Sequence, residues 1–185
     1  MLVERGGNDV YVSDIFGQGG SYWFALGAIY DMGGNDSYMS YQYAQGSGVH
    51  LAAAALIDFS GNDAYVSHGV SQGCGHDLAI GFLNDRGGDD SYVTWDLAQG
   101  AGNANGIGIL VDEGDGEDSY SAKREYNVQG YGNWRRDFGS VGLLLDLGGN
   151  DIYSHKGAEG KWWNLSNYGI GIDFPAGIPQ QNNSK

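Results

Sequence analysis

A short motif, glycine-asparagine-aspartate-x-tyrosine, occurs six times along this chain of 185 residues, with an acidic residue replacing asparagine in two copies. Its final aspartate stands at positions 9, 36, 63, 90, 118 and 151, so the steps are 27, 27, 27, 28 and 33 residues. A fixed period of this size is typical of stacked-repeat architectures, in which each repeat buries a face against its neighbours. The period therefore constrains the fold more than any other feature of the sequence.

Two further residue types keep the same register. A glutamine followed by glycine stands nine residues after the motif aspartate in four repeats, and Gln129 continues that series after an insertion. Thirteen residues after each early glutamine, an aspartate closes an apolar run, and the aspartates of this row are Asp31, Asp58, Asp85, Asp112, Asp146 and Asp173. The segments between these markers favour short strands, because glycine interrupts every window in which a helix would form.

We therefore predict an all-β fold, a parallel β-solenoid of about six coils, with residues 1–185 forming a single domain. Equivalent residues of stacked coils lie about 4.8 Å apart, which makes a rod about 29 Å long. Coil five, about residues 113–146, carries insertions, and residues 174–185 are expected to form a C-terminal cap or tail. A propeller is the alternative, but its blades need about 40 residues or more.

In such a rod each repeated position becomes a column. The motif tyrosines are expected to stack as an aromatic core column. The glutamines are expected to form an amide ladder, in which each side chain bonds to the next along the axis. The glycine after each glutamine indicates a tight corner or a positive φ.

The acidic residues carry most of the charge. The net charge is −14 and the isoelectric point is about 4.3, which argues against binding to nucleic acid or to an anionic membrane. No apolar run is long enough to span a bilayer, so membrane insertion is not expected. Cys74 is the single cysteine, which excludes an intramolecular disulfide and a thiolate zinc site.

Stacking carboxylates in columns is unfavourable. Two carboxylates 4.8 Å apart repel by about 3.5 kcal/mol at an effective dielectric of 20, and over two columns this rivals a domain's stability of about 5–15 kcal/mol. Turn amides can solvate some of these groups, but a cation bound between coils offsets the repulsion more completely. Oxygen-only ligands select calcium or magnesium. The candidate metal ligands are Asp9, Asp31, Asp36, Asp58, Asp63, Asp85, Asp90, Asp112, Asp118, Asp146 and Asp151.

The segment Gly34-Asn35-Asp36-Ser37-Tyr38 and its copies resemble part of the haemolysin-type, or repeats-in-toxin, calcium-binding nonapeptide. In that family the glycine-rich turns of a parallel β-roll hold Ca²⁺ through aspartate oxygens and main-chain carbonyls. The resemblance implies Ca²⁺ as the cation and the aspartates that close each motif as its ligands. The chain departs from the family in its period of 27 instead of nine, in its tyrosine instead of leucine, and in an aspartate at the family's first glycine.

The insertions of coil five bring basic and aromatic residues into an otherwise acidic repeat. The candidate ligand-binding residues there are Lys123, Arg124, Tyr126, Trp134, Arg135 and Arg136. Loops on a rigid scaffold often bind ligands, and cationic with aromatic groups suit an acidic glycan. The alternative is a loop that folds over the rod as internal counter-charge. Both interpretations stay open from the sequence.

The strands before the upstream aspartates are apolar on both faces, as in 109–111 and 143–145. Continuous apolar runs indicate cover on both sides, by the C-terminal tail, by another chain or by an adjoining domain. Trp162, Trp163, Phe174 and Pro175 are expected to supply part of it as an end cap. We therefore expect a homo-oligomer or an adjoining domain.

The leading hypothesis is a calcium-stabilised repeat module of bacterial type, extracellular or on the cell surface, with a structural or adhesive role. We expect its secretion signal to lie outside this chain. The alternative is a polysaccharide-binding β-helix module, or a polysaccharide-cleaving one that uses a coil-five lysine or arginine as base beside calcium. The sequence shows no Ser/His/Asp spacing, nucleotide-binding loop or zinc signature, which argues against an enzyme.

Overall fold

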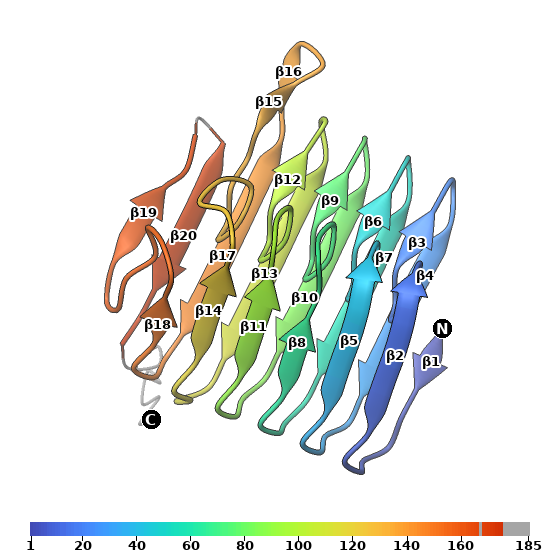
Figure 1. Ribbon diagram of the computed structural model, residues 1–185, viewed down its shortest axis with the longest axis vertical. Helices are drawn as coiled ribbons and strands as arrows, with labels where there is room; N and C mark the ends of the chain where they lie inside the picture. Colours follow the sequence, from blue (N-terminus) through green and yellow to red (C-terminus); the bar gives the residue numbers. More distant parts are fainter. Residues whose placement is uncertain (167, 176–185) are drawn as a thin grey trace, which may run out of the picture.

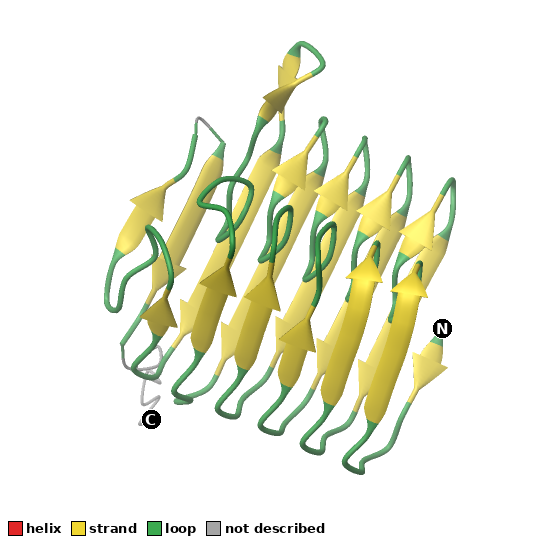
Figure 2. Ribbon diagram, viewed as in Figure 1, coloured by secondary structure: helices red, strands yellow, loops and turns green. Residues whose placement is uncertain are grey.

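The computed structural model describes residues 1–166 and 168–175, and within these ranges the chain consists of strands and turns without a helix. The chain winds into a parallel β-solenoid of about six coils, each offset from the next by about 27 residues (Figure 1). Figure 2 shows the strands of successive coils side by side, with turns along both edges. The predicted β-solenoid is confirmed.

Three parallel sheets line the coils. Sheet A contains β1 (Leu2–Val3), β4 (Leu26–Asp31), β7 (Ala53–Asp58), β10 (Ile80–Asp85), β13 (Ile107–Glu113), β17 (Val141–Leu147) and β20 (Gly169–Asp173), with β19 (Trp162–Asn164) antiparallel to β20 at its end. Sheet B contains β2 (Val10–Ile15), β5 (Ser37–Gln42), β8 (Ala64–Val66), β11 (Ser91–Thr94), β14 (Ser119–Ala122) and β18 (Ile152–Tyr153). Sheet C contains β3 (Ser21–Tyr22), β6 (Gly48–Val49), β9 (Gly75–His76) and β12 (Gly102–Asn103). A hairpin of β15 (Trp134–Arg135) and β16 (Phe138–Gly139) projects from coil five.

The core is a set of straight columns inside the coils. The motif tyrosines stack with ring centroids 4.7–4.9 Å apart and planes within 6° of parallel, as predicted. A column of leucines from sheet A packs against them, and its members are Leu56, Leu83, Leu110 and Leu144. Because the repeat length fixes the register, like residues meet in every coil.

The glutamines form a column, but their bonding differs from the prediction. Gln45 Nε2 donates to the carbonyl of Tyr38 in its own coil and to that of Val66 in the next, and Gln72 repeats this pattern. The expected side-chain-to-side-chain amide ladder is therefore wrong. Gln45 itself has a φ of 50°, so the corner directs its side chain across the coil toward sheet B.

The glycine after each glutamine makes the corner possible. Gly46 has a φ of +72°, and a Cβ at this position would lie 2.1 Å from the carbonyl oxygen of Phe82. A larger residue would therefore clash with the main chain of another coil. This confirms the predicted tight corner with positive φ.

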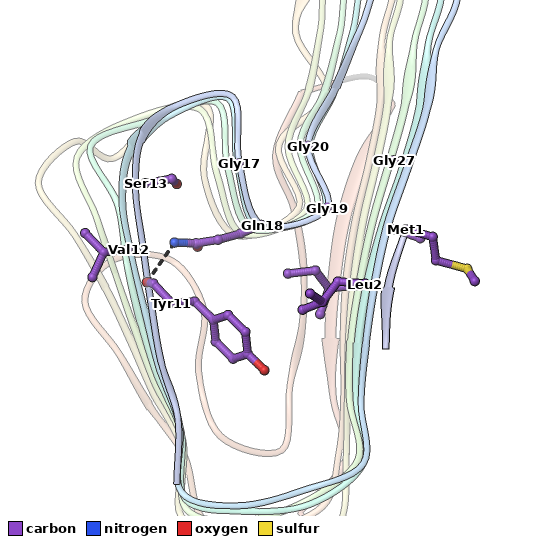
Figure 3. Close-up of a pocket in the computed structure, with 12 residues that line it drawn as sticks. Met1, Leu2, Tyr11, Val12, Ser13, Gly17, Gln18, Gly19, Gly20 and Gly27 are labelled. Atoms are coloured by element: carbon purple, nitrogen blue, oxygen red, sulfur yellow. Dashed lines mark hydrogen bonds between the residues drawn. The ribbon is translucent and has the colours of Figure 1, made fainter. Parts of the chain in front are cut away.

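The two ends of the rod differ. At the C-terminal end Trp163 is buried, meets Tyr153 edge-on at 5.1 Å and donates its indole N–H to the carbonyl of Gln129. Of the expected cap, Trp163 fills this role, while Trp162 and Phe174 are exposed and residues 176–185 lie outside the described residues. At the N-terminal end the interior of the first coil opens into a hollow of about 470 Å³, and Figure 3 shows Tyr11 and Leu2 pointing into it.

Candidate metal centre

Aspartates form two buried columns beside the turns that join sheet A to sheet B. The strand-end column lies at or next to the ends of the sheet A strands and comprises Asp31, Asp58, Asp85, Asp112, Asp146 and Asp173. The turn column directly precedes the sheet B strands and comprises Asp9, Asp36, Asp63, Asp90, Asp118 and Asp151. All of these aspartates except Asp9 are buried.

The glycines of the motif explain how the turns stack so closely. A Cβ on Gly34 would lie 1.3 Å from the carbonyl oxygen of Gly7, and one on Gly61 would lie 1.4 Å from that of Gly34. Only glycine permits this approach of one turn to the next. The close stacking then forces the carboxylates of neighbouring coils together.

The turn column uses one carboxylate oxygen of each residue. The Oδ1 atom of Asp63 accepts the main-chain N–H of Asp36 at 2.5 Å, and Asp90 Oδ1 accepts that of Asp63 at 2.6 Å. The Oδ2 atoms of Asp36, Asp63, Asp90 and Asp151 are buried and have no hydrogen-bond partner among the described residues. Each of these residues therefore presents a free oxygen inside the protein.

The strand-end column is better satisfied. Tyrosine hydroxyls donate to the Oδ2 atoms of its first five members, as Tyr38 does to Asp58 at 2.6 Å and Tyr65 to Asp85 at 2.6 Å, whereas Asp173 Oδ2 is buried without a partner among the described residues. The Oδ1 atoms of Asp31, Asp58 and Asp85 accept main-chain N–H groups two residues later, as Asp85 does from Gly87 at 3.1 Å. The tyrosine core thus holds the Oδ2 side of this column in place.

The two columns meet in groups of three carboxylates. In each group one oxygen per residue lies within 4.8 Å of the others. The groups are Asp31, Asp36 and Asp58; Asp63, Asp85 and Asp90; Asp90, Asp112 and Asp118; Asp118, Asp146 and Asp151; and Asp151, Glu159 and Asp173. These clusters could hold a metal ion, since carboxylate oxygens are the ligands of hard cations.

Burial and mutual repulsion disfavour the ionised carboxylates. Burial, together with the neighbouring Asp31 and Asp58 carboxylates, raises the pKa of Asp36 to about 6, although the hydrogen bond that it accepts from the main-chain N–H of Asp9 lowers it. Burial also raises the pKa of Asp112, and the Asp118 and Asp85 charges add to this. Within the described ranges, the ion pairs of basic side chains involve other carboxylates. The columns therefore need protons or a bound cation to be neutral.

No known protein family, curated protein or solved structure matches the chain. The described residues also contain no helix long and apolar enough to cross a membrane. The function of the columns is therefore inferred from their own chemistry.

Most of the predicted metal ligands lie in the carboxylate groups, and one does not. The structure brings ten of the eleven into the groups of three, whereas Asp9 belongs to none of them and lies partly exposed in the first coil. Glu159 and Asp173 complete the group around Asp151 and were not among the predicted ligands. Both had a signal in the sequence, since Glu159 occupies the glutamine position of the last coil and Asp173 continues the upstream row.

The basic residues of coil five mostly contact the rod. Arg124 forms an ion pair with Asp96 at 3.0 Å, Arg136 pairs with Asp77, and the Lys123 ammonium lies 5.3 Å from the Trp95 ring centroid. These contacts fit the interpretation of the insertions as internal counter-charge. Asp77 also contacts His50, a small cluster that no repeat position indicated.

Two of the remaining candidate ligand-binding residues, Trp134 and Arg135, line an open hollow, whereas Tyr126 does not. Arg135 and Trp134 from the hairpin line a space of about 430 Å³ together with Arg124, and Trp134 and Tyr126 are exposed. The asparagines that line it are Asn103, Asn127 and Asn133. The hairpin projects from the edge of the solenoid opposite the aspartate turns (Figure 1), so the structure does not bring the two predicted sites together.

Proposed function

We propose that this chain is a structural or adhesive repeat module that works outside the cell and is stabilised by calcium bound between its aspartate columns. The observation that carries the proposal is the set of buried Oδ2 atoms without a partner among the described residues, at Asp36, Asp63, Asp90, Asp151 and Asp173. A buried acceptor without a partner is destabilising, and a buried carboxylate without a counter-charge more so. A cation removes both penalties at once.

The ligand set supports calcium over magnesium. Mg²⁺ demands near-ideal octahedral geometry and is usually held by one or two carboxylates and several waters, whereas Ca²⁺ accepts several carboxylates. Each group offers three carboxylates. Calcium also accepts six to eight ligands in irregular geometry, so carbonyls of the glycine turns and water would complete its shell.

The same chemistry supports an extracellular location. Calcium modules outside the cell have dissociation constants of about 10⁻⁴–10⁻³ M, and sites of this affinity fill where calcium is plentiful. A column of such sites would then stiffen the whole rod when the protein leaves the cell. The resemblance of the Gly-Asn-Asp turns to haemolysin-type repeats supports the same conclusion.

Calorimetric titration and thermal melting at pH 8 test the proposal. We expect Ca²⁺ to bind and to raise the melting temperature, Mg²⁺ to do so less, and a chelator to reverse the gain. If Ca²⁺ neither binds nor changes the melting temperature, the columns are neutralised by protons and the proposal is wrong.

A second candidate function is binding of an acidic glycan in the hollow of coil five. The observation in its favour is the combination of Arg135, Trp134 and three asparagine amides around one space. A screen with oligouronates tests it, using Arg135→Gln and the exposed Arg5→Gln at the other end of the rod as control. Loss of binding only in Arg135→Gln supports the candidate, and no binding by the unmodified protein refutes it.

A further inference from the structure

The outer face of sheet A is largely apolar, with a polar cluster of Asn84, Arg86 and Glu113 at one edge. Its outward residues form three columns, since strand registers pair Ile80 with Ile107 and Phe82 with Ile109. The columns are Leu26, Ala53, Ile80, Ile107 and Val141; Ala28, Ala55, Phe82, Ile109, Leu143 and Ile170; and Tyr30, Ile57, Asn84, Val111, Leu145 and Ile172. We call this surface the sheet A face. Leu26, Ile80, Ile107 and Val141 are exposed, so no described segment covers them fully.

The three columns carry no charge at pH 7, although the chain has a net charge of −14, and Glu113 at the end of β13 is a charged residue just beyond them. The outward positions of sheet B are mixed, with Ser37, Ser91 and Ser119 in one column and Met39, Val66 and Val93 in the next. Parallel sheets are normally covered on both faces, and large apolar patches on soluble proteins mark interaction surfaces.

The relief of the face suits a second copy of the same chain. Ala53 and Ala55 on β7 are small, whereas β10 beside it presents Ile80 and Phe82 at the same positions. The face therefore combines a shallow depression with a ridge beside it. A twofold axis would place the ridge of each copy over the depression of the other, as an isologous interface requires.

We propose that two copies pair through their sheet A faces in solution. Six strands at about 4.8 Å and about five residues at about 3.3 Å cover about 475 Å² in projection, or about 950 Å² for two copies. Specific interfaces begin at about 1,000 Å², and the uneven surface of the side chains adds to the projected area. The region 176–185 contains one large aliphatic residue, Ile178, so by composition it offers little apolar surface for this face.

The test is sedimentation equilibrium of the full chain, with Ile107→Lys as the variant and Val93→Lys as its control. Ile107 on sheet A and Val93 on sheet B are matched, being exposed by 37 % and 38 %. We expect the unmodified protein and Val93→Lys to dimerise, and Ile107→Lys to raise the dimer dissociation constant at least about 30-fold, as loss of an interface hot spot does. Circular dichroism of both variants checks that they fold.

Salt gives a second measurement on the unmodified protein. Each copy carries a charge of −14, so higher salt should screen the repulsion between copies and strengthen the dimer. A monomer at high salt and high concentration would overturn the proposal, as would a dimer that Ile107→Lys leaves intact. Measurement both with Ca²⁺ and with chelator separates this interface from the proposed metal sites.

Discussion

The substitution Asp90→Asn distinguishes the two ways of neutralising the aspartate columns. Asp90 belongs to two of the five carboxylate groups, and its Oδ1 accepts the main-chain N–H of Asp63. Asparagine keeps an acceptor oxygen for that bond and removes the charge. Its neighbour Asp89 is exposed, and Asp89→Asn makes the same change in charge while restoring the Gly-Asn-Asp motif.

Without calcium, Asp90→Asn should stabilise the protein at pH 8, because burial raises the pKa of Asp90 to about 10 and the folded protein must protonate a group that the unfolded chain ionises. The repulsion that this protonation avoids is about 3.5 kcal/mol for one carboxylate neighbour at about 4.8 Å and an effective dielectric of 20. About 1 kcal/mol shifts the melting temperature of a chain of this length by about 2–4 °C, so the expected rise in chelator is about 7–14 °C. Asp89→Asn should change it by far less, because an exposed charge is screened by solvent.

With saturating calcium, Asp90→Asn should instead lower the melting temperature. A site filled at 100 times its dissociation constant contributes about 2.7 kcal/mol, so two impaired groups remove about 5.4 kcal/mol of the calcium-dependent gain. The assay is thermal melting of the three proteins in calcium and in chelator. If Asp90→Asn lowers the melting temperature in chelator, the repulsion argument is wrong. An unchanged gain from calcium would show that Asp90 is not a ligand.

Three further predictions concern pH, the corner and the cap. Burial raises the pKa of Asp63 to about 8, above its usual 3.8, so the folded protein holds more protons than the unfolded chain between these values. The metal-free melting temperature should therefore fall as pH rises from about 4 to about 8, while the gain in melting temperature from calcium grows. A flat pH profile in chelator would contradict this. Gly46→Ala should lower the free energy of unfolding by about 2–4 kcal/mol in denaturant, because its Cβ would lie 2.1 Å from a carbonyl oxygen. Gly160 also has a positive φ, but the atom nearest to its Cβ would be 3.4 Å away, so Gly160→Ala should cost about 1 kcal/mol. Equal losses in the two variants would refute the clash. By the same measurement, Trp163→Ala should lower the free energy of unfolding by about 3–5 kcal/mol and Trp162→Ala by less than about 0.5 kcal/mol, since the exposed fractions of the two side chains are 7 % and 71 %. A small loss in Trp163→Ala would show that Trp163 does not cap the tyrosine column.

The repeat made most of the fold predictable. In a solenoid the period determines which residues are neighbours, so Tyr38 and Tyr65 could be placed on one column before any coordinates. The direction in which side chains point within the coil was harder to predict from the sequence. Gln45 bonds to main-chain carbonyls because its own φ of 50° turns it across the coil, and a spacing in the sequence carries no information on that angle.

The candidate site shows the same division. The aspartate columns follow from the period, whereas the tyrosine hydroxyls that orient the strand-end column depend on the width of the coil. The contact of Arg136 with Asp77 could not be predicted from the sequence, because the hairpin that carries Arg136 interrupts the repeat and has no equivalent in the other described coils. The apolar strands indicated a second covered face, and the registers show how extensive that face is.

The stacking of coils also determines how the rod would respond to force. Each coil contacts mainly the coils beside it, so a pull on the two ends of the chain would peel off one coil at a time. A coil of 27 residues releases about 90–97 Å of extended chain, at about 3.3–3.6 Å per residue. The insertion in coil five, where equivalent aspartates are 33 residues apart, lengthens that step to about 110–120 Å. An extension trace would thus show a ladder of equal steps with one longer step, which marks the position of coil five in the order of rupture.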